Sequence, residues 1–451
     1  MAAIPQQKPR YSHLDEYNRD MQRFAEVQVE GRVTDMIGQM IEAYNPGCAI
    51  GSLCHIFNPD TQSEVLAEVV GFRKDKILLM PLKNLLGVNP KCRVIPERRP
   101  PVVPVGDDLL GRVIDPLFVP LDDLDPINFS DEVPLYNDPP NPLVRRRIEQ
   151  SLDVGIKAIN GCLSCGRGQR VGILAGSGVG KSVLLGMMAQ NTDADVNVIA
   201  LIGERGREVQ DFIHRDLGEE GMRRSVMVVA TSDQPPLLRM RGAFVATAIA
   251  EYFCSKGKSV LLMMDSVTRF AMAQREVGLA AGEPPTTKGY PPSVFAMLPK
   301  LLERAGTSST EGTITGFYTV LVEGDDANDP IADSIRAIVD GHIVLSRELA
   351  TRGHYPAIDI AASASRVMVD VASITHQSLA LTLRRTLATY REAEDLINIG
   401  AYVQGSNTEI DYALSKYQDI QSFLRQDINE RSTLLEAEAA LQQIFSDSIP
   451  E

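Results

Sequence analysis

The stretch AGSGVGKS at residues 175–182 decides how this chain folds. It stands between an apolar run, VGIL at 171–174, and the helix-like sequence VLLGMMAQ at 183–190. Its three glycines let the backbone turn tightly enough to aim successive N–H groups at the phosphates of a nucleotide. Lys181 adds a positive charge, Ser182 offers a hydroxyl to Mg²⁺, and the following helix presents its positive end. The sequence therefore predicts a phosphate-binding loop rather than a chance glycine-rich turn. The residues expected to contact the nucleotide are Gly176, Ser177, Gly178, Val179, Gly180, Lys181, Ser182 and Val183.

The composition is that of an ordinary globular protein with an excess of negative charge. The 451 residues carry a formal net charge of −14, and 44% of them are hydrophobic, which allows two or three domains with sizeable cores. Because nucleic-acid binders rely on basic surfaces, we expect no nucleic-acid partner. The sequence holds no apolar run long enough to span a bilayer and no signal peptide at its start. Any membrane contact is therefore expected to be peripheral.

The six cysteines do not follow a disulfide or zinc pattern. Only Cys162 and Cys165 form a CxxC, and no second pair or suitably spaced histidine accompanies it. Reduced thiols of a cytosolic protein are the expected state.

The chain divides into four predicted parts. Residues 1–25 are polar, but four of them fall on one helical face: Leu14, Tyr17, Met21 and Phe24. This amphipathic segment could dock on a partner, on a lipid surface or on its own neighbouring domain. Residues 26–100 hold short β-like runs typical of a small closed β-barrel. Residues 101–370 alternate apolar strands with helical patterns after a proline-rich connector at 101–150, which predicts an α/β core with a mainly parallel sheet. Residues 371–451 are helical throughout, apart from a break at 400–407.

Carboxylates at the ends of two predicted strands are candidates for metal binding and catalysis. Asp265 ends the strand SVLLMMD, where it could hold Mg²⁺ opposite Ser182. Glu204 follows a buried-looking strand and could polarise an attacking water, with Arg205 beside it. Glu208, one helical turn further on, is a third candidate for the Mg²⁺ site. Alternatively, Asp265 is an ordinary acidic turn residue and Glu204 belongs to an ion-paired helix start.

The segment GHYPAIDIAASASRVM at 353–368 offers two more candidates. Arg366 follows small residues on a strand-like stretch, so its side chain could reach the γ-phosphate held by a neighbouring subunit. Tyr355 could stack on adenine. Taken alone, both would be ordinary surface residues.

Together these motifs resemble a known family. AGSGVGKS, GERGRE, DSVTRFA, REVGLAAGEPP with GYPPSVF, PKLLERAG and GHYPAIDIAASASR occur in the order and spacing seen in the ATPases of bacterial type III protein export, in flagella and injectisomes. The resemblance runs from near residue 25 to roughly residue 400. Two departures stand out: Ala175 replaces a glycine of the related synthase subunits, and Phe118-Val119 stands where relatives often have a glycine turn.

The resemblance implies a fold, a substrate and roles for individual residues. It implies a RecA-like core, ATP with Mg²⁺, and hydrolysis with Glu204 as general base. Arg366 matches the arginine finger given to the adjacent subunit, and Arg205 matches the arginine beside the base. Asp265 corresponds to the Mg²⁺-organising aspartate, and Tyr355 to the adenine-stacking aromatic.

The implied partners are those of an export machine. The resemblance implies a homohexamer at the cytoplasmic face of the inner membrane, below an integral membrane export gate. Stator and stalk proteins and chaperone–cargo complexes would bind it. The stretch GAYVQGSNTEIDYALSKY favours the flagellar branch over the injectisome.

Three alternatives stay open at the level of the sequence. A catalytic subunit of a proton-linked rotary ATP synthase shares the loop and the arginine, but REVGLAAGEPP and the short C-terminal helices favour the export branch. A Rho-type RNA translocase fits the acidic charge poorly, since no basic aromatic platform is visible in the predicted barrel. A nucleotide-holding structural subunit is disfavoured by Glu204.

Overall fold

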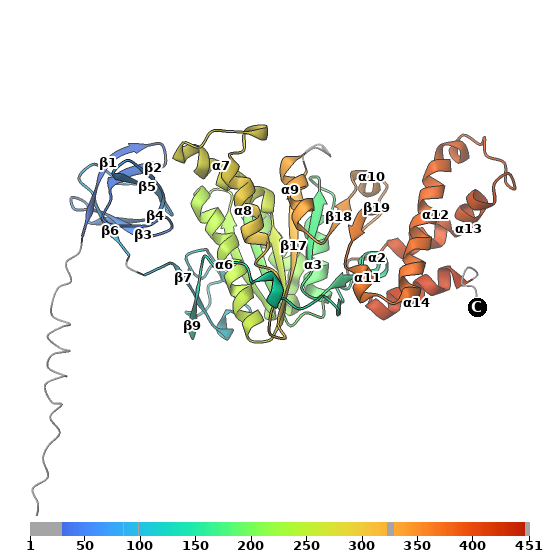
Figure 1. The fold of residues 1–451 in the computed structure, drawn as a ribbon. Helices are drawn as coiled ribbons and strands as arrows, with labels where there is room; N and C mark the ends of the chain where they lie inside the picture. The colour runs from blue at the N-terminus through green and yellow to red at the C-terminus, as the bar shows by residue number, and fades with distance from the viewer. Residues whose placement is uncertain (1–28, 84, 98, 323–328, 447–451) are drawn as a thin grey trace, which may run out of the picture.

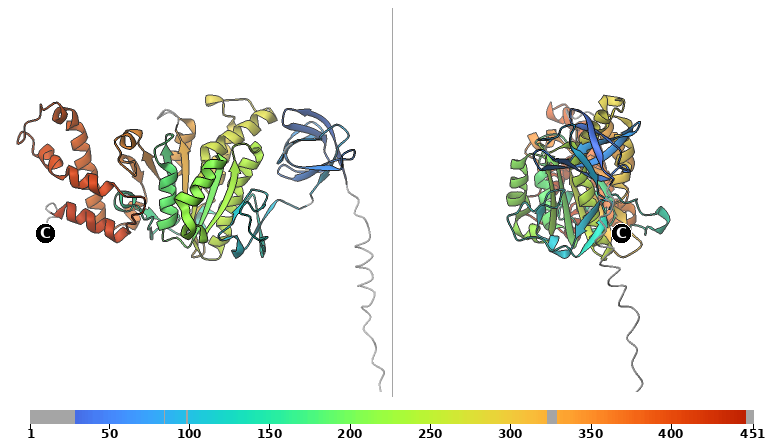
Figure 2. Two further views of the ribbon diagram at one scale, coloured as in Figure 1. Left: turned by 180° about the vertical axis from the view of Figure 1, so that it is seen from behind. Right: turned by 90° about the vertical axis from the view of Figure 1, so that its left-hand side faces the viewer.

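The computed structural model describes residues 29–83, 85–97, 99–322 and 329–446. These form a β-barrel, an α/β core and a group of helices, arranged one after another along an elongated molecule (Figure 1). The same order is seen from behind in the left view of Figure 2. The predicted fold class is therefore confirmed. The amphipathic segment predicted at 1–25 lies outside the described residues, and the proposed domain boundaries stay predictions.

The N-terminal barrel closes with the strand order β1-β2-β5-β4-β3-β6. Its interior is filled by small and branched apolar side chains such as Ile41, Ile56 and Leu79, all almost fully buried. Closure pairs the hydrogen-bonding edges that an open sheet would expose. The six strands are β1 (Gly31–Ile37), β2 (Met40–Tyr44), β3 (Leu53–Asn58), β4 (Ser63–Arg73), β5 (Lys76–Pro81) and β6 (Arg93–Pro96).

The core is built on a nine-stranded sheet with the path β19-β18-β12-β17-β15-β13-β14-β8, and β16 pairs with β17 beside this path. The pairs along the path are parallel, except that β19 runs antiparallel to β18; β16 is also antiparallel to β17. The strand that leads into the phosphate-binding loop, β12, lies between β18 and β17. The strands are β8 (Val113–Ile114), β12 (Arg170–Ala175), β13 (Val196–Glu204), β14 (Ser225–Thr231), β15 (Ser259–Asp265), β16 (Gly306–Thr307), β17 (Thr313–Leu321), β18 (Gly341–Leu345) and β19 (Ile358–Ser365).

Helices cover both faces of this sheet, which explains why its strands are apolar without alternation. Side chains of β13 take part in an apolar cluster on each face of the sheet. Val198 and Ile202 belong to the cluster that includes residues of α6, α7, α8 and α9. Ile199 and Leu201 belong to the cluster that includes residues of α2 and α3. The helical elements of the core are α2 (Lys157–Cys162), α3 (Lys181–Asn191), α4 (Gly206–Asp211), the π-helix η3 (Phe212–Leu217), α5 (Gly218–Arg223), α6 (Pro236–Ser255), α7 (Val267–Ala281), η4 (Thr287–Gly289), α8 (Pro292–Leu302), α9 (Pro330–Ile338), α10 (Arg347–Thr351) and α11 (Met368–Val371).

The connector contributes a strand to the core sheet. Its proline content did not predict a strand there. Its strand β8 pairs with β14 in parallel and forms one edge of the sheet. Phe118 has a φ of 64°, a left-handed conformation that glycine adopts without steric cost, and Asp115 Oδ1 supports this turn by accepting from the N–H groups of Leu117 and Val119, both at 2.8 Å. The remaining connector elements are β7 (Val102–Val105), η1 (Asp107–Leu109), β9 (Asp131–Pro134) and η2 (Pro142–Val144). Beyond the connector, β10 (Ser151–Leu152) and β11 (Cys165–Gly166) pair with each other.

Three helices form the C-terminal part: α12 (Ile374–Asn398), α13 (Thr408–Leu424) and α14 (Leu434–Ile444). Each begins with a side-chain cap, from Ser373, Asn407 and Thr433 respectively, which satisfies backbone N–H groups of the first turn. The predicted break at 400–407 separates α12 from α13. The three helices pack on α2 of the core through the apolar cluster that also covers one face of the sheet.

The six cysteines are free and buried. Burial raises the pKa of the thiols of Cys48, Cys54, Cys162, Cys165 and Cys254. Among the helices in the described part of the chain, none has the length and apolar character needed to cross a bilayer.

Candidate active site

A cleft of about 930 Å³ opens where the phosphate-binding loop leaves the carboxyl end of β12. Loop glycines at 178 and 180 have φ values of 77° and 90°, so the loop depends on glycine at these positions. The structure brings almost all of the predicted loop residues to the cleft: Gly176, Ser177, Gly178, Gly180, Lys181, Ser182 and Val183. Val179 is the exception, because its side chain is buried in the core under the loop.

Lys181 is held between two carboxylates. Its Nζ forms a short ion pair with Asp265 Oδ1 and lies 3.5 Å from Glu204 Oε1. Burial alone would lower the pKa of Lys181, but Asp265 and Glu204 outweigh it and hold this pKa above the ordinary value. The lysine is therefore charged and placed to meet phosphate oxygens.

Asp265 ends β15 and is 3% exposed. Thr319 of the neighbouring strand β17 donates from Oγ1 to Asp265 Oδ1 at 2.7 Å, which fixes the carboxylate. Within the described ranges, no group of three or more His, Cys, Asp or Glu could hold a metal by itself. Asp265 and the hydroxyl of Ser182 still fit Mg²⁺, which usually takes only one or two carboxylates and completes its shell with phosphates and water.

Glu204 ends β13 at the same edge of the sheet and is 9% exposed. Burial raises its pKa to about 7. Asp265 and the carboxylate of Glu208, which accepts a hydrogen bond from protonated Glu204, add to this rise, and Lys181 opposes it. A carboxylate with this pKa can take a proton from water near neutral pH.

Residues 205–208, which follow Glu204, are exposed to solvent. Arg205 and Glu208 both line the cleft and form an ion pair with each other, 3.3 Å from Nη1 to Oε1. This pair does not include Glu204, whose ion-pair partner is Lys181. The assignment of Glu208 to the Mg²⁺ site stays a prediction, and so do the roles of Arg205 and Asp265.

Four basic residues in the cleft were missed by sequence reasoning: Arg269 and Arg275 from α7, Lys288, and Arg347 at the start of α10. Arg269 Nε is buried, and no described residue gives it a hydrogen-bond partner. The signal for Arg269 was its place in DSVTRFA, four residues after Asp265, which puts it on the first turn of the helix beside the cleft. The other three had no distinguishing signal.

The two candidates from the segment 353–368 lie apart from each other. The ring of Tyr355 packs beside the loop, where a Cβ at Gly180 would lie 3.5 Å from it, and the residue is 47% exposed. Arg366 is exposed directly after β19, and the cleft of its own chain is lined without it. The structure therefore brings Tyr355 to the loop and leaves Arg366 at the surface.

The fold and the cleft define a nucleotide-binding ATPase with a RecA-like core. Residues 155–365 match the model of the ATP synthase alpha/beta family, nucleotide-binding domain, and residues 372–443 match the T3SS EscN ATPase C-terminal domain. The chain belongs to the family of flagellar and type III secretion ATPases, and it is a hydrolase.

Similar proteins come from both branches of this family. The chain is 53% identical over 416 residues to the flagellum-specific ATP synthase of Bacillus subtilis (strain 168), covering 92% of this chain and 94% of that protein. It is 48% identical over 418 residues to the type 3 secretion system ATPase of Xanthomonas euvesicatoria, covering 93% and 94%. A solved structure of the assembled ATPase EscN with its central stalk EscO, from enteropathogenic E. coli, superimposes with a TM-score of 0.85 at 45% identity, covering 92% of this chain and 99% of that one. The match of the C-terminal helices supports the export branch over a rotary synthase subunit.

Proposed function

We propose that this chain hydrolyses ATP to ADP and phosphate in order to energise protein export by a bacterial flagellum, releasing or unfolding chaperone-bound cargo. The observation that carries the proposal is the meeting of Lys181, Glu204 and the buried Asp265 at one edge of the sheet, within the cleft region below the phosphate-binding loop. The flagellar branch is favoured because the flagellar relative is more similar than the secretion relative, by a small margin.

The residues of the cleft divide the work of hydrolysis. Lys181 binds the phosphates, and Glu204 orients the attacking water and accepts its proton. Mg²⁺ bound with ATP would neutralise phosphate charge, held by Ser182 and Asp265, with Glu208 beside them. Tyr355, exposed next to the loop, stacks on adenine. Arg205 lies at the mouth of the cleft, where it can contact the phosphate that leaves.

Arg366 acts on the cleft of a neighbouring copy. Its exposure outside its own cleft supports this role, because a residue there can reach a nucleotide only across an interface. We infer a homohexamer, supported by the likeness to assembled EscN. A central stalk like EscO, a stator, chaperone–cargo complexes and the export gate at the cytoplasmic face of the inner membrane are the partners that we propose with it.

Mixed rings test this arrangement. We expect Lys181→Ala and Arg366→Ala each to abolish turnover when alone, and the arginine variant to bind ATP normally, since loss of such an arginine costs about 10³–10⁵ in rate. Rings assembled from both variants should regain activity wherever an intact cleft meets an intact Arg366. Mixed rings that stay inactive would remove Arg366 from the mechanism.

Complementation tests the branch of export. In a flagellated bacterium whose own flagellar ATPase has been deleted, this chain should restore secretion of flagellar proteins, and the Glu204→Gln variant should not. Rescue of injectisome secretion without rescue of motility would assign the chain to the other branch.

A further inference from the structure

Strand β19 carries a large bulge shortly before Arg366. Asp359 pairs with Val344 and Ala364 pairs with His342, so the four residues 360–363 lie opposite the single residue Ile343. Bulges of this kind bend a strand and redirect the side chains that follow. Beyond the bulge, Ala364 and Ser365 pair with β18 again and the N–H of Arg366 donates to the carbonyl of Asp340 at 3.0 Å, so the bulge offsets the short paired stretch that leads to Arg366.

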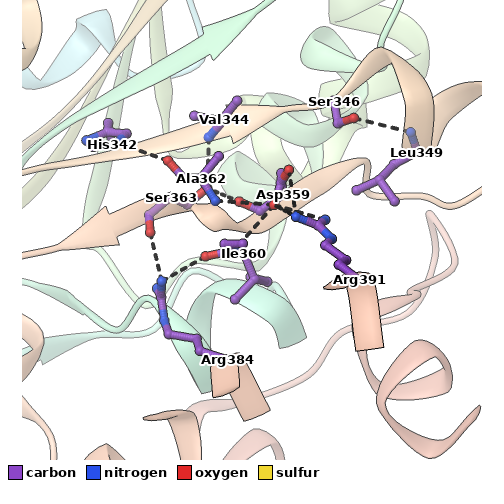
Figure 3. Close-up of polar contacts among 11 residues, drawn as sticks. His342, Val344, Ser346, Leu349, Asp359, Ile360, Ala362, Ser363, Arg384 and Arg391 are labelled. Atoms are coloured by element: carbon purple, nitrogen blue, oxygen red, sulfur yellow. Dashed lines mark hydrogen bonds and ion pairs between the residues drawn. The ribbon is translucent and has the colours of Figure 1, made fainter. Parts of the chain in front are cut away.

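Side chains within the strand fold the bulge into one shape (Figure 3). Asp359 Oδ1 accepts from the N–H groups of Ala361 and Ala362 at 3.0 and 3.2 Å. Ser363 Oγ donates to the carbonyl of Asp359 and accepts from the N–H of Val344 at 2.9 Å. These contacts close the bulge and join it to β18, where His342 Nε2 also lies 3.1 Å from the carbonyl oxygen of Ala362.

Two arginines of α12 attach the bulge to the C-terminal helices as well, as Figure 3 shows. Arg384 Nη1 donates to the carbonyls of Ile360 and Ser363 at 2.8 and 2.9 Å. Its Nη2 donates to the carbonyl of Cys162, at the end of α2, at 3.2 Å. Arg391, two turns further along α12, pairs with Asp359 at 3.1 Å. The guanidinium of Arg384 thus joins the C-terminal helices, the core and both ends of the bulge.

We propose that Arg384 is a positioning residue for Arg366. By holding the bulge in place, it keeps Arg366 aimed at the cleft of the neighbouring copy, and it links that aim to the position of α12. The hydrogen bonds from Arg384 to three main-chain carbonyls are charge-assisted, and such bonds are strong and directional. They can therefore hold the main chain of the bulge in one position. The inference rests on the proposed role of Arg366 across the interface.

The first test separates positioning from simple loss of charge. Arg384→Met should lower kcat by about 10²-fold, the loss expected when a reacting group is misplaced by about 1 Å, while KM for ATP and nucleotide affinity stay unchanged. Arg384→Lys, which keeps the charge and part of the hydrogen bonding, should recover part of the rate. The matched control is Arg385→Met, which removes the same charge from an exposed site on the same helix and should leave kcat unchanged. An equal loss in the control would overturn the proposal.

The second test uses mixed rings, because a positioning defect should reside only in the copy that lends Arg366. Arg384→Met mixed with Lys181→Ala should regain activity, since the first supplies an intact cleft and the second an intact arginine. Arg384→Met mixed with Arg366→Ala should stay inactive. If Arg384→Met does not assemble, the Arg384→Lys variant takes its place in both mixtures.

The reference mixture of Lys181→Ala with Arg366→Ala distinguishes failure of the positioning role of Arg384 from failure of the interface role of Arg366. If it regains activity and the mixture of Arg384→Met with Lys181→Ala does not, Arg384 supports the whole fold and the positioning role is wrong. If the reference mixture itself stays inactive, the interface role of Arg366 fails, and the positioning role fails with it.

Discussion

Glu204 lies close to one cation, Lys181, and two anions, Asp265 and Glu208, and burial is the largest influence on its pKa. Lys181 favours the ionised carboxylate, but burial and Asp265 disfavour it more strongly, so the pKa rises to about 7. A general base must be ionised before it can accept a proton. The same burial that lets Glu204 act near neutral pH therefore makes it inactive in acid.

The pH dependence of hydrolysis follows from this shift. We expect kcat/KM for ATP to rise with pH through about 7, because below that value Glu204 is protonated and cannot accept a proton from water. Initial rates across a pH series would measure the inflection. Glu208→Gln is the control: it removes a group that raises the pKa of Glu204, so the inflection should move to lower pH and remain. If kcat/KM stays constant over the pH range between the pKa values of ordinary carboxyl groups and those of ordinary amines, the assignment of Glu204 as general base is contradicted.

At the level of elements, a buried polar group joins the barrel to the core. Glu68 of β4 accepts from the hydroxyl of Tyr136 at 2.7 Å, and its other oxygen lies 3.6 Å from Arg241 Nη1 of α6. Burial raises the pKa of Glu68 to about 6, and Tyr136 and Arg241 oppose this rise. With both partners in place, the carboxylate is ionised at neutral pH.

Removing the hydroxyl should loosen this joint. We expect Tyr136→Phe to lower the free energy of unfolding by about 1.5 kcal/mol, the order of a hydrogen bond to a charged group. The loss should be largest above about pH 6 and should shrink in acid, where Glu68 is protonated and a weaker acceptor. Urea denaturation at two pH values measures this effect. Tyr44→Phe is the control, since Tyr44 is exposed. An equal loss of unfolding free energy in the control would contradict a stabilising role of the Tyr136–Glu68 hydrogen bond.

The elements differ in how well the sequence predicts them. The strands β12, β13, β14, β15, β17 and β18 were predictable because continuous apolar runs ended at turn residues. The edge strand β8 was not, since two residues within a proline-rich connector carry no periodic signal. The bulge in β19 was also not predictable, because its contacts with Val344 and Arg384 join residues that are far apart in the sequence.

For the whole molecule, the candidate site could be predicted in part. The loop residues and the carboxylates at strand ends follow from local sequence, because parallel strands bring their carboxyl ends to one edge. The basic residues Arg275, Lys288 and Arg347 could not be found, since each is one of many cations on exposed segments. Arg366 lies outside the cleft of its own chain, so its role depends on an assembly that one chain does not contain.

Assembly should therefore control the rate. We expect the ATPase rate per subunit to rise steeply with protein concentration as rings form, and to level off once they are complete. Activity and molar mass measured on the same samples would show the two rising together. A constant rate per subunit, while the mass changes from monomer to ring, would contradict hydrolysis at a shared interface.

The burial of all six thiols has a practical consequence for labelling this protein with a dye. Thiol-reactive dyes need an accessible thiolate, and the native cysteines are enclosed, most of them with raised pKa values. One cysteine introduced at Ile399, which is exposed beyond the end of α12, should therefore be labelled selectively in the otherwise unchanged sequence. Energy transfer from a dye there to a fluorescent nucleotide would then measure whether the distance between the tip of the helical region and the cleft changes during turnover.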